Sequence, residues 1–164
     1  MTKTVFVTGS SNGFGNDVAK TLAALGHRVF ATMRRPNDRH RDAAAELRTV
    51  GVEPLELDVT RTPSVDAAFA AVFEKTSGKL DVLINNAGVA SEGLSETFTP
   101  EQVSEMFDVN VVGQQRTLRA ALPRMRNNGS GLVINIGSIL GRLTIPFLGL
   151  YGASKHAVEA MTES

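Results

Sequence analysis

Residues 4–15 read TVFVTGSSNGFG, and this stretch determines the class of fold that the chain can adopt. Its first five residues form a largely apolar run that is typical of a buried β-strand. Gly9, Gly13 and Gly15 follow with the spacing Gly-x-x-x-Gly-x-Gly. Glycines here allow a sharp turn and a close approach to a bound group, and the N-terminus of the next helix offers free N–H groups to a phosphate. The stretch therefore predicts a strand, a phosphate-binding turn and a helix; the alternative is an ordinary glycine-rich turn.

The same alternation of short apolar strands and amphipathic helices continues along the chain. Further strands are expected at residues 28–32, 54–57, 80–85 and 132–136. Helices are expected from the glycine turn to about Gly26, around residues 43–47, from an N-cap at Thr62 to about residue 77, and as a long helix from Thr99-Pro100, where Thr99 and Gln102 have capping-box spacing. Such strands indicate a parallel sheet covered on both faces, and right-handed crossovers then give a doubly wound α/β domain. We predict one Rossmann-type domain over residues 1–164.

The composition excludes several classes of function. Apolar residues make up 42% of the chain, charged residues 21%, and the formal net charge is zero, so nothing favours binding to nucleic acid or to an anionic membrane. The chain has no cysteine and three scattered histidines, so no metal site is expected. No signal peptide follows Met1, and no apolar run reaches the roughly 18 residues of a membrane span. We expect a cytoplasmic protein.

The residues after the second strand indicate which dinucleotide would bind. A site that prefers NAD usually has an acid there for the ribose hydroxyls. This chain has Arg34 and Arg35 instead. Guanidinium groups suit the 2′-phosphate of NADP, which they hold by charge-assisted hydrogen bonds. The stretch predicts NADP as cofactor; the alternative is a solvated basic loop, since Arg39 and Arg41 lie nearby.

Two further strands end in residues that suit a nucleotide. Asp58 and Val59 end the third strand, where the carboxylate either contacts the adenine amino group or only orders the turn before Thr62. Residues 85–88 are Asn-Asn-Ala-Gly and end the fourth strand at the same edge of the sheet. Their small side chains allow close approach to a ribose, and the asparagines can tie neighbouring strands together. The predicted cofactor-binding residues of these loops are Gly9, Ser11, Asn12, Gly13, Phe14, Gly15, Arg34, Arg35, Asp58, Val59, Asn86, Ala87 and Gly88.

Groups suited to proton transfer lie in the last third of the chain. Tyr151, the only tyrosine, is four residues before Lys155, which places both side chains on one helix face. An ammonium beside a phenol favours the phenolate. Ser138 lies 13 residues before Tyr151, just after a predicted strand. The alternatives are a core tyrosine and a turn serine. Asn110 continues the apolar stripe of the long helix, where a polar side chain needs partners; its alternative role is a structural kink or cap.

Taken together, these motifs resemble the short-chain dehydrogenase/reductase family. Residues 8–15 and 85–88, Asn110, Ser138, and Tyr151 with Lys155 occur in the order and at about the spacing of that family, over nearly the whole chain. The resemblance implies the strand order 3-2-1-4-5 and an oxidoreductase that transfers a hydride between NADP(H) and a carbonyl or secondary alcohol. It also implies a homo-oligomer, a dimer or tetramer, formed through the helix starting at Pro100 and the helix bearing Tyr151.

The resemblance further implies a role for each group. Tyr151 is the proton donor in reduction and the base in oxidation. Lys155 supports it, and both contact the cofactor, Lys155 through the nicotinamide ribose. Ser138 hydrogen-bonds the substrate oxygen. Asn110 anchors a water that passes protons toward the lysine.

The end of the chain departs from the family pattern, because family members are usually longer. We therefore expect an incomplete part of a longer domain, without the later strands and most of the substrate lid, and with residues 132–136 as an exposed edge. The alternative functions are a non-catalytic dinucleotide-binding module and a nucleotide-sugar epimerase, although the spacing in residues 8–15 argues against the second. The segment before Tyr151 is apolar, and it either walls a pocket for an apolar substrate or packs on the core; its apolar residues are Leu143, Ile145, Phe147, Leu148 and Leu150.

Overall fold

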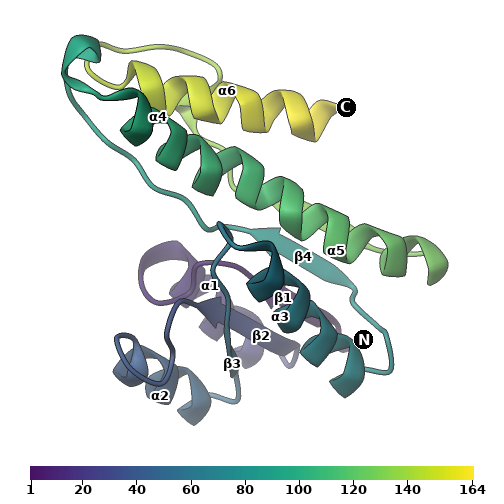
Figure 1. Cartoon of the computed structure of the whole chain (residues 1–164). Coiled ribbons are helices and arrows are strands. Elements are labelled where there is room, and N and C mark those ends of the chain that lie inside the picture. Colours follow the sequence, from purple (N-terminus) through teal and green to yellow (C-terminus); the bar gives the residue numbers. More distant parts are fainter.

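A five-stranded parallel sheet lies at the centre of the computed structural model, which describes residues 1–164 (Figure 1). Its strands are β1 (Thr4–Val7), β2 (Arg28–Met33), β3 (Glu53–Glu56), β4 (Val82–Asn85) and β5 (Leu132–Asn135). They are hydrogen-bonded in the order β3-β2-β1-β4-β5, and all neighbours are parallel. The predicted fold class and strand order are confirmed. One difference is that β4 begins at Val82 and not at residue 80. Just before it, the Asp81 side chain accepts a 2.7 Å hydrogen bond from the Thr4 N–H.

Six α-helices connect and cover the strands. They are α1 (Gly13–Ala24), α2 (Arg41–Thr49), α3 (Thr62–Lys75), α4 (Pro100–Phe107), α5 (Gly113–Asn127) and α6 (Gly149–Glu163). A π-helical turn, η2 (Asp108–Val112), joins α4 to α5, and short 3₁₀ turns are η1 (Ser95–Thr97) and η3 (Ile139–Gly141). The helix α6 lies against α4 and η2 (Figure 1).

The helix ends show where local sequence signals decide the structure. The capping box at Thr99 is confirmed: its side chain accepts from the Gln102 N–H at 3.3 Å, and its own N–H donates to Gln102 Oε1 at 2.9 Å. Gly26 follows the end of α1 with φ of +82°, as a C-terminal glycine does. The predicted N-cap at Thr62 is wrong, because α3 already includes Thr62 and is preceded by Arg61, which makes no side-chain cap.

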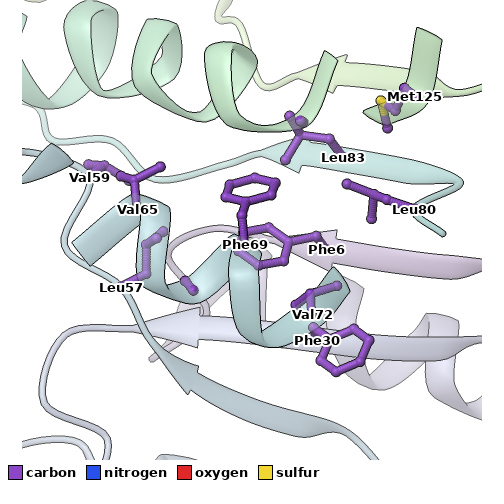
Figure 2. Packing of buried hydrophobic residues seen from close by; sticks show 12 residues of the cluster. Phe6, Phe30, Leu57, Val59, Val65, Phe69, Val72, Leu80, Leu83 and Met125 are labelled. Atoms are coloured by element: carbon purple, nitrogen blue, oxygen red, sulfur yellow. The ribbon is translucent and has the colours of Figure 1, made fainter. Parts of the chain in front are cut away.

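Alternating residues of the strands build a separate core on each face of the sheet. Val5 and Val7 pack on the face of α1 and α2, whereas Phe6 packs on the face of α3 and α5. The Phe6 and Phe69 rings stack there with centroids 4.4 Å apart (Figure 2). Burying such a side chain contributes about 1.5–3 kcal/mol. The sheet is therefore covered on both faces at its centre, as the near-continuous apolar strands predict.

The outer strand β5 is covered on one face only. Val133 packs into the core beneath α3 and α5. Leu132 and Ile134 pair in register with Val82 and Ile84 and so face the side of α1, but they are 53% and 38% exposed. The expected exposure of this strand is observed in the chain described. No helix in it has both the length and the apolar character needed to cross a membrane.

Candidate active site

The glycine turn after β1 lies against the loop after β4, and this contact explains two of its glycines. Gly9 has φ of +70°, and a Cβ there would lie 2.7 Å from the Ala87 Cα. A Cβ at Gly15 would overlap the Gly9 carbonyl oxygen and Asn86 Nδ2. The glycine turn can approach the other loop this closely only because Gly9 and Gly15 have no Cβ.

Hydrogen bonds hold the two loops in this arrangement. Asn86 Nδ2 donates to the carbonyl oxygens of Thr8 at 2.8 Å and Gly9 at 3.0 Å. Thr8 Oγ1 accepts from the N–H groups of Asn86 and Ala87 at 3.0 and 2.9 Å. One strand further, Asn85 Nδ2 donates to Asn135 Oδ1 at 3.0 Å, so the prediction that the asparagines tie neighbouring strands together is confirmed. The turn is held in place by these bonds before any ligand binds.

A cleft of about 490 Å³ opens at this edge of the sheet. The predicted residues that line it are Gly9, Ser11, Asn12, Gly13, Phe14, Gly15, Arg34, Asp58, Val59, Asn86, Ala87 and Gly88. The N-terminus of α1 faces this turn with no acidic residue in its first turn, and the Asn12 side chain does not cap it. Its free N–H groups and partial positive charge therefore suit an anion such as a pyrophosphate. The residues present fit a dinucleotide.

The basic rim of the cleft differs from the one that the sequence suggests. Arg34 lines the cleft, together with Arg39 and His40. Arg35 does not: it adopts a left-handed φ of +50° and forms an ion pair with Asp38 outside the cleft. Burial lowers the pKa of His40, and the charges of Arg39, Arg34 and Arg35 lower it further. Positive charge is therefore concentrated beside the end of β2.

Asp58 and Val59 line the cleft at the end of β3, and Val59 is held by a residue that the sequence does not single out. Asp58 lines the cleft and also orders its own turn, because Oδ1 accepts from the Thr60 N–H at 3.0 Å and the Thr60 hydroxyl at 2.7 Å. Arg116 Nη1 donates to the Val59 carbonyl at 3.0 Å, and Arg116 pairs with Asp108 at 2.8 Å. Arg116 thereby joins the loop after β3 to η2, a contact that only the fold creates.

The residues predicted to transfer protons lie where α6 crosses the loops after β4 and β5. Lys155 is buried, and its Nζ donates to the Ile136 carbonyl at 2.6 Å and lies 5.9 Å from the centre of the Tyr151 ring. A Cβ at Gly88 would lie 3.9 Å from Lys155 Nζ and 3.3 Å from Asn110 Oδ1. Lys155 and Asn110 therefore adjoin the end of the cleft at Gly88, although neither they nor Tyr151 line it. Burial lowers the pKa of Lys155, and the carboxylate of Glu159 opposes that shift.

Asn110 joins three segments of the site. Its Oδ1 accepts from the Val89 N–H at 2.8 Å, and its Nδ2 donates to the Val89 carbonyl and to Ser154 Oγ, both at 2.9 Å. It also lies within the π-helical turn η2. The side chain thus satisfies the need for partners that its buried position creates, and it links η2, the loop after β4 and α6.

Ser138 lies between β5 and η3 and caps that short turn. Its Oγ accepts from the Leu140 N–H at 3.2 Å. A hydroxyl that accepts such a bond still has its own hydrogen to donate. The arrangement is therefore compatible with both alternatives for this residue, a turn serine and a donor to a substrate oxygen.

Comparisons with known proteins identify the family. A sequence model of the short chain dehydrogenase family matches residues 3–164. The chain is 39% identical over 161 residues to 3-ketodihydrosphingosine reductase of Bacteroides thetaiotaomicron, and the match covers 98% of this chain and 56% of that protein. It is 40% identical over 167 residues to 17-beta-hydroxysteroid dehydrogenase type 1 of Homo sapiens, with 98% and 50% covered. The chain belongs to the short-chain dehydrogenase family and spans about half the length of these curated relatives.

Solved structures share the fold and contain either cofactor. A variant of actinorhodin polyketide ketoreductase, solved with NADPH, has a TM-score of 0.91 and 32% identity, and the match covers 99% of this chain and 63% of that one. A short-chain dehydrogenase/reductase from Burkholderia phymatum in complex with NAD has a TM-score of 0.89 and 32% identity, with 99% and 58% covered. Structural neighbours thus bind NADP(H) or NAD.

Proposed function

We propose that this chain carries the cofactor site and the proton-transfer groups of an oxidoreductase that moves a hydride between NADP(H) and a carbonyl or secondary alcohol. The observation that carries the proposal is the continuity of the site. The cleft built by the glycine turn ends at Gly88, and Gly88 adjoins Lys155 and Asn110. This continuity supports a dinucleotide that extends from the glycine turn toward α6, the helix that carries Tyr151.

The residues of the chain divide the chemistry among them. A nicotinamide cofactor, when bound, supplies or accepts the hydride. Tyr151 donates its phenolic proton to the substrate oxygen in reduction, and its phenolate takes that proton in oxidation. The Lys155 ammonium favours the phenolate and binds the ribose hydroxyls. Ser138 donates a hydrogen bond to the substrate oxygen and stabilises the charge that develops on it. Asn110 anchors the water that leads protons to Lys155.

The basic rim supports NADP rather than NAD as the preferred cofactor. No acid lies at the end of β2, and Arg34, Arg39 and His40 line the cleft beside it. An adenosine 2′-phosphate is the anion that such a rim suits, and the planar guanidinium of Arg34 can bind it with two parallel hydrogen bonds.

Replacing Arg34 with alanine should weaken NADPH binding by about 10- to 100-fold, because its charge-assisted hydrogen bonds to the 2′-phosphate are lost, and leave NADH binding nearly unchanged. Arg35→Ala is the matched control, because that guanidinium pairs with Asp38 outside the cleft and its loss should change neither affinity appreciably. Fluorescence titration of both cofactors measures the two effects. Equal weakening of NADPH and NADH by Arg34→Ala would show that the arginine does not recognise the 2′-phosphate.

The loops beside the proton-transfer groups support an apolar substrate. Leu143, Ile145 and Phe147 are each at least 44% exposed and so do not pack on the core, whereas Leu148 and Leu150 are half-buried. The Gly93 N–H donates to the Phe147 carbonyl at 2.9 Å, which joins the loop after β4 to the segment before α6. Ile139, next to Ser138, adds a side chain that is 70% exposed.

The names of the relatives agree with this proposal, since dihydrosphingosine and steroid derivatives are largely apolar molecules. Binding of an apolar substrate to this surface is favourable, because the apolar side chains and the substrate are both removed from water.

The double substitution Ile139→Ser with Phe147→Ser should lower kcat/KM for a long-chain methyl ketone by about tenfold, because less apolar surface is buried against the chain. The value for a short methyl ketone should change little. Val50→Ser, at the end of α2 and outside this region, is the control for losing an exposed apolar side chain. Steady-state rates with NADPH decide the question, and an equal loss for both ketones would contradict an apolar substrate.

A further inference from the structure

Glu159 lies beneath the turn that carries Ser138, although no motif includes it. It is one helical turn after Lys155 on α6, and its side chain is only 27% exposed. A Cβ at Gly137 would overlap Glu159 Oε1. A Cβ at Gly141 would lie 2.7 Å from Glu159 Cγ and 3.0 Å from the Lys155 carbonyl oxygen. Glycines on both sides of Ser138 therefore leave the room that Glu159 occupies.

An ion pair connects the far end of this turn to the same carboxylate. Arg142 follows η3 directly, and its Nε donates to Glu159 Oε2 at 3.2 Å, with Nη2 at 3.1 Å from the same oxygen. Arg142 also pairs with Glu163, one turn further along α6. These carboxylates raise the pKa of Arg142. The segment that carries Ser138 is thus attached to the helix that carries Tyr151 and Lys155.

The charge of Glu159 also acts on Lys155. Burial lowers the pKa of Lys155, and the Glu159 carboxylate raises it. The other ionisable group near the ammonium on α6 is Tyr151, while η2 and the loop after β4 present the uncharged Asn110 and Gly88. Arg142, which follows η3, pairs with Glu159 and not with Lys155. A nearby carboxylate favours the charged form of a buried ammonium.

We propose that Glu159 is a positioning residue of the active site. It fixes the Ser138 turn on α6 through Gly137, Gly141 and Arg142, and its negative charge stabilises the Lys155 ammonium, to a degree that Arg142 limits. The inference rests on the proposed function for the roles of Ser138 and Lys155.

Two charge-neutralising variants test it because they must act in opposite directions. Glu159→Gln keeps the shape of the side chain but removes its charge, so the pKa of Lys155 should fall. Arg142→Gln leaves the Glu159 charge uncompensated, so the pKa of Lys155 should rise. Glu163→Gln is the matched control, because it removes the other carboxylate that pairs with Arg142. Glu163 lies two helical turns from Lys155 on α6, so the pKa of Lys155 should stay unchanged.

Two measurements separate this inference from the proposed function. The first follows the ¹³Cε signal of Lys155 by NMR against pH, assigned by its loss in Lys155→Met, and needs no turnover. The second is the pH profile of kcat/KM for ketone reduction by NADPH, which should shift in the same directions. Glu159→Gln should also lower kcat on the order of tenfold, with the KM for NADPH little changed, because the Ser138 turn is displaced.

The inference would be overturned if the Lys155 titration shifted in the same direction in Glu159→Gln and Arg142→Gln, or in neither of them. If the wild type shows no turnover but the Lys155 titration shifts as expected, the proposed function fails and the electrostatic part of the inference stands. Circular dichroism of each variant shows whether it is folded.

Discussion

Replacing Tyr151 with phenylalanine should lower kcat by about 10²- to 10⁴-fold and leave the affinity for NADPH nearly unchanged. The change removes only the hydroxyl that transfers the proton. The ring remains on α6, half-buried beside Lys155, whose Nζ lies 5.9 Å from the ring centre. The cleft in which we propose that the cofactor binds is lined by other elements, so binding should be preserved. Initial rates with NADPH and a ketone, and fluorescence titration of NADPH, measure the two quantities.

The control for this substitution is Phe107→Leu, a comparable change of an aromatic side chain on α4, which should leave kcat within the ordinary range of variants remote from the chemistry. Turnover by Tyr151→Phe close to that of the wild type would contradict its role as acid and base. A wild-type chain that binds NADPH but reduces no ketone would instead favour the alternative of a non-catalytic dinucleotide-binding module.

Replacing Gly15 with alanine should abolish measurable NADPH binding and destabilise the fold by about 1–3 kcal/mol, as overpacking does. Alanine ordinarily favours a helix over glycine, and Gly15 lies in the first turn of α1. Here the new methyl group would overlap the Gly9 carbonyl oxygen and Asn86 Nδ2. The first is backbone of the same turn and cannot rotate away, so the turn itself must open, and the Asn86 side chain that holds it must move. That change disrupts the surface on which the pyrophosphate would lie.

Gly13→Ala is the matched control in the same turn. A Cβ at Gly13 would meet no atom within 4 Å, so the change costs only the strain of its left-handed φ of +54°, about 1 kcal/mol. NADPH titration and thermal unfolding of both variants separate steric overlap from backbone strain. Gly15→Ala binding NADPH as well as Gly13→Ala does would contradict the close approach of the two loops.

Short sequence signals predict helices and strands correctly where the interaction involved spans only a few residues. The alternation of Val5, Phe6 and Val7 predicts a strand buried on both sides, and the structure places those side chains in two different cores. The capping box at Thr99 forms as its spacing predicts. The ends of elements are less certain, as Thr62 shows, because the propensity to begin a helix differs little between neighbouring residues.

The cofactor rim shows why other parts of the site could not be predicted. Arg34 and Arg35 are equivalent in the sequence, but a left-handed φ at Arg35 and its pairing with Asp38 direct it away from the cleft. Arg39 and His40, further along the same loop, line the cleft instead. Which of several neighbouring cations faces a cleft depends on the path of the loop, and composition does not encode that path.

The alternation of apolar strands with helices predicts the doubly wound sheet. The family resemblance supplies its strand order and groups the glycine turn, Asn110, Ser138, Tyr151 and Lys155 as one expected set. The contact of Arg116 with the Val59 carbonyl and the place of Glu159 beneath the Ser138 turn appear only in the folded chain. The reason is physical: such contacts connect segments far apart in the chain, and burial, desolvation and close packing arise only when the sheet has brought those segments together.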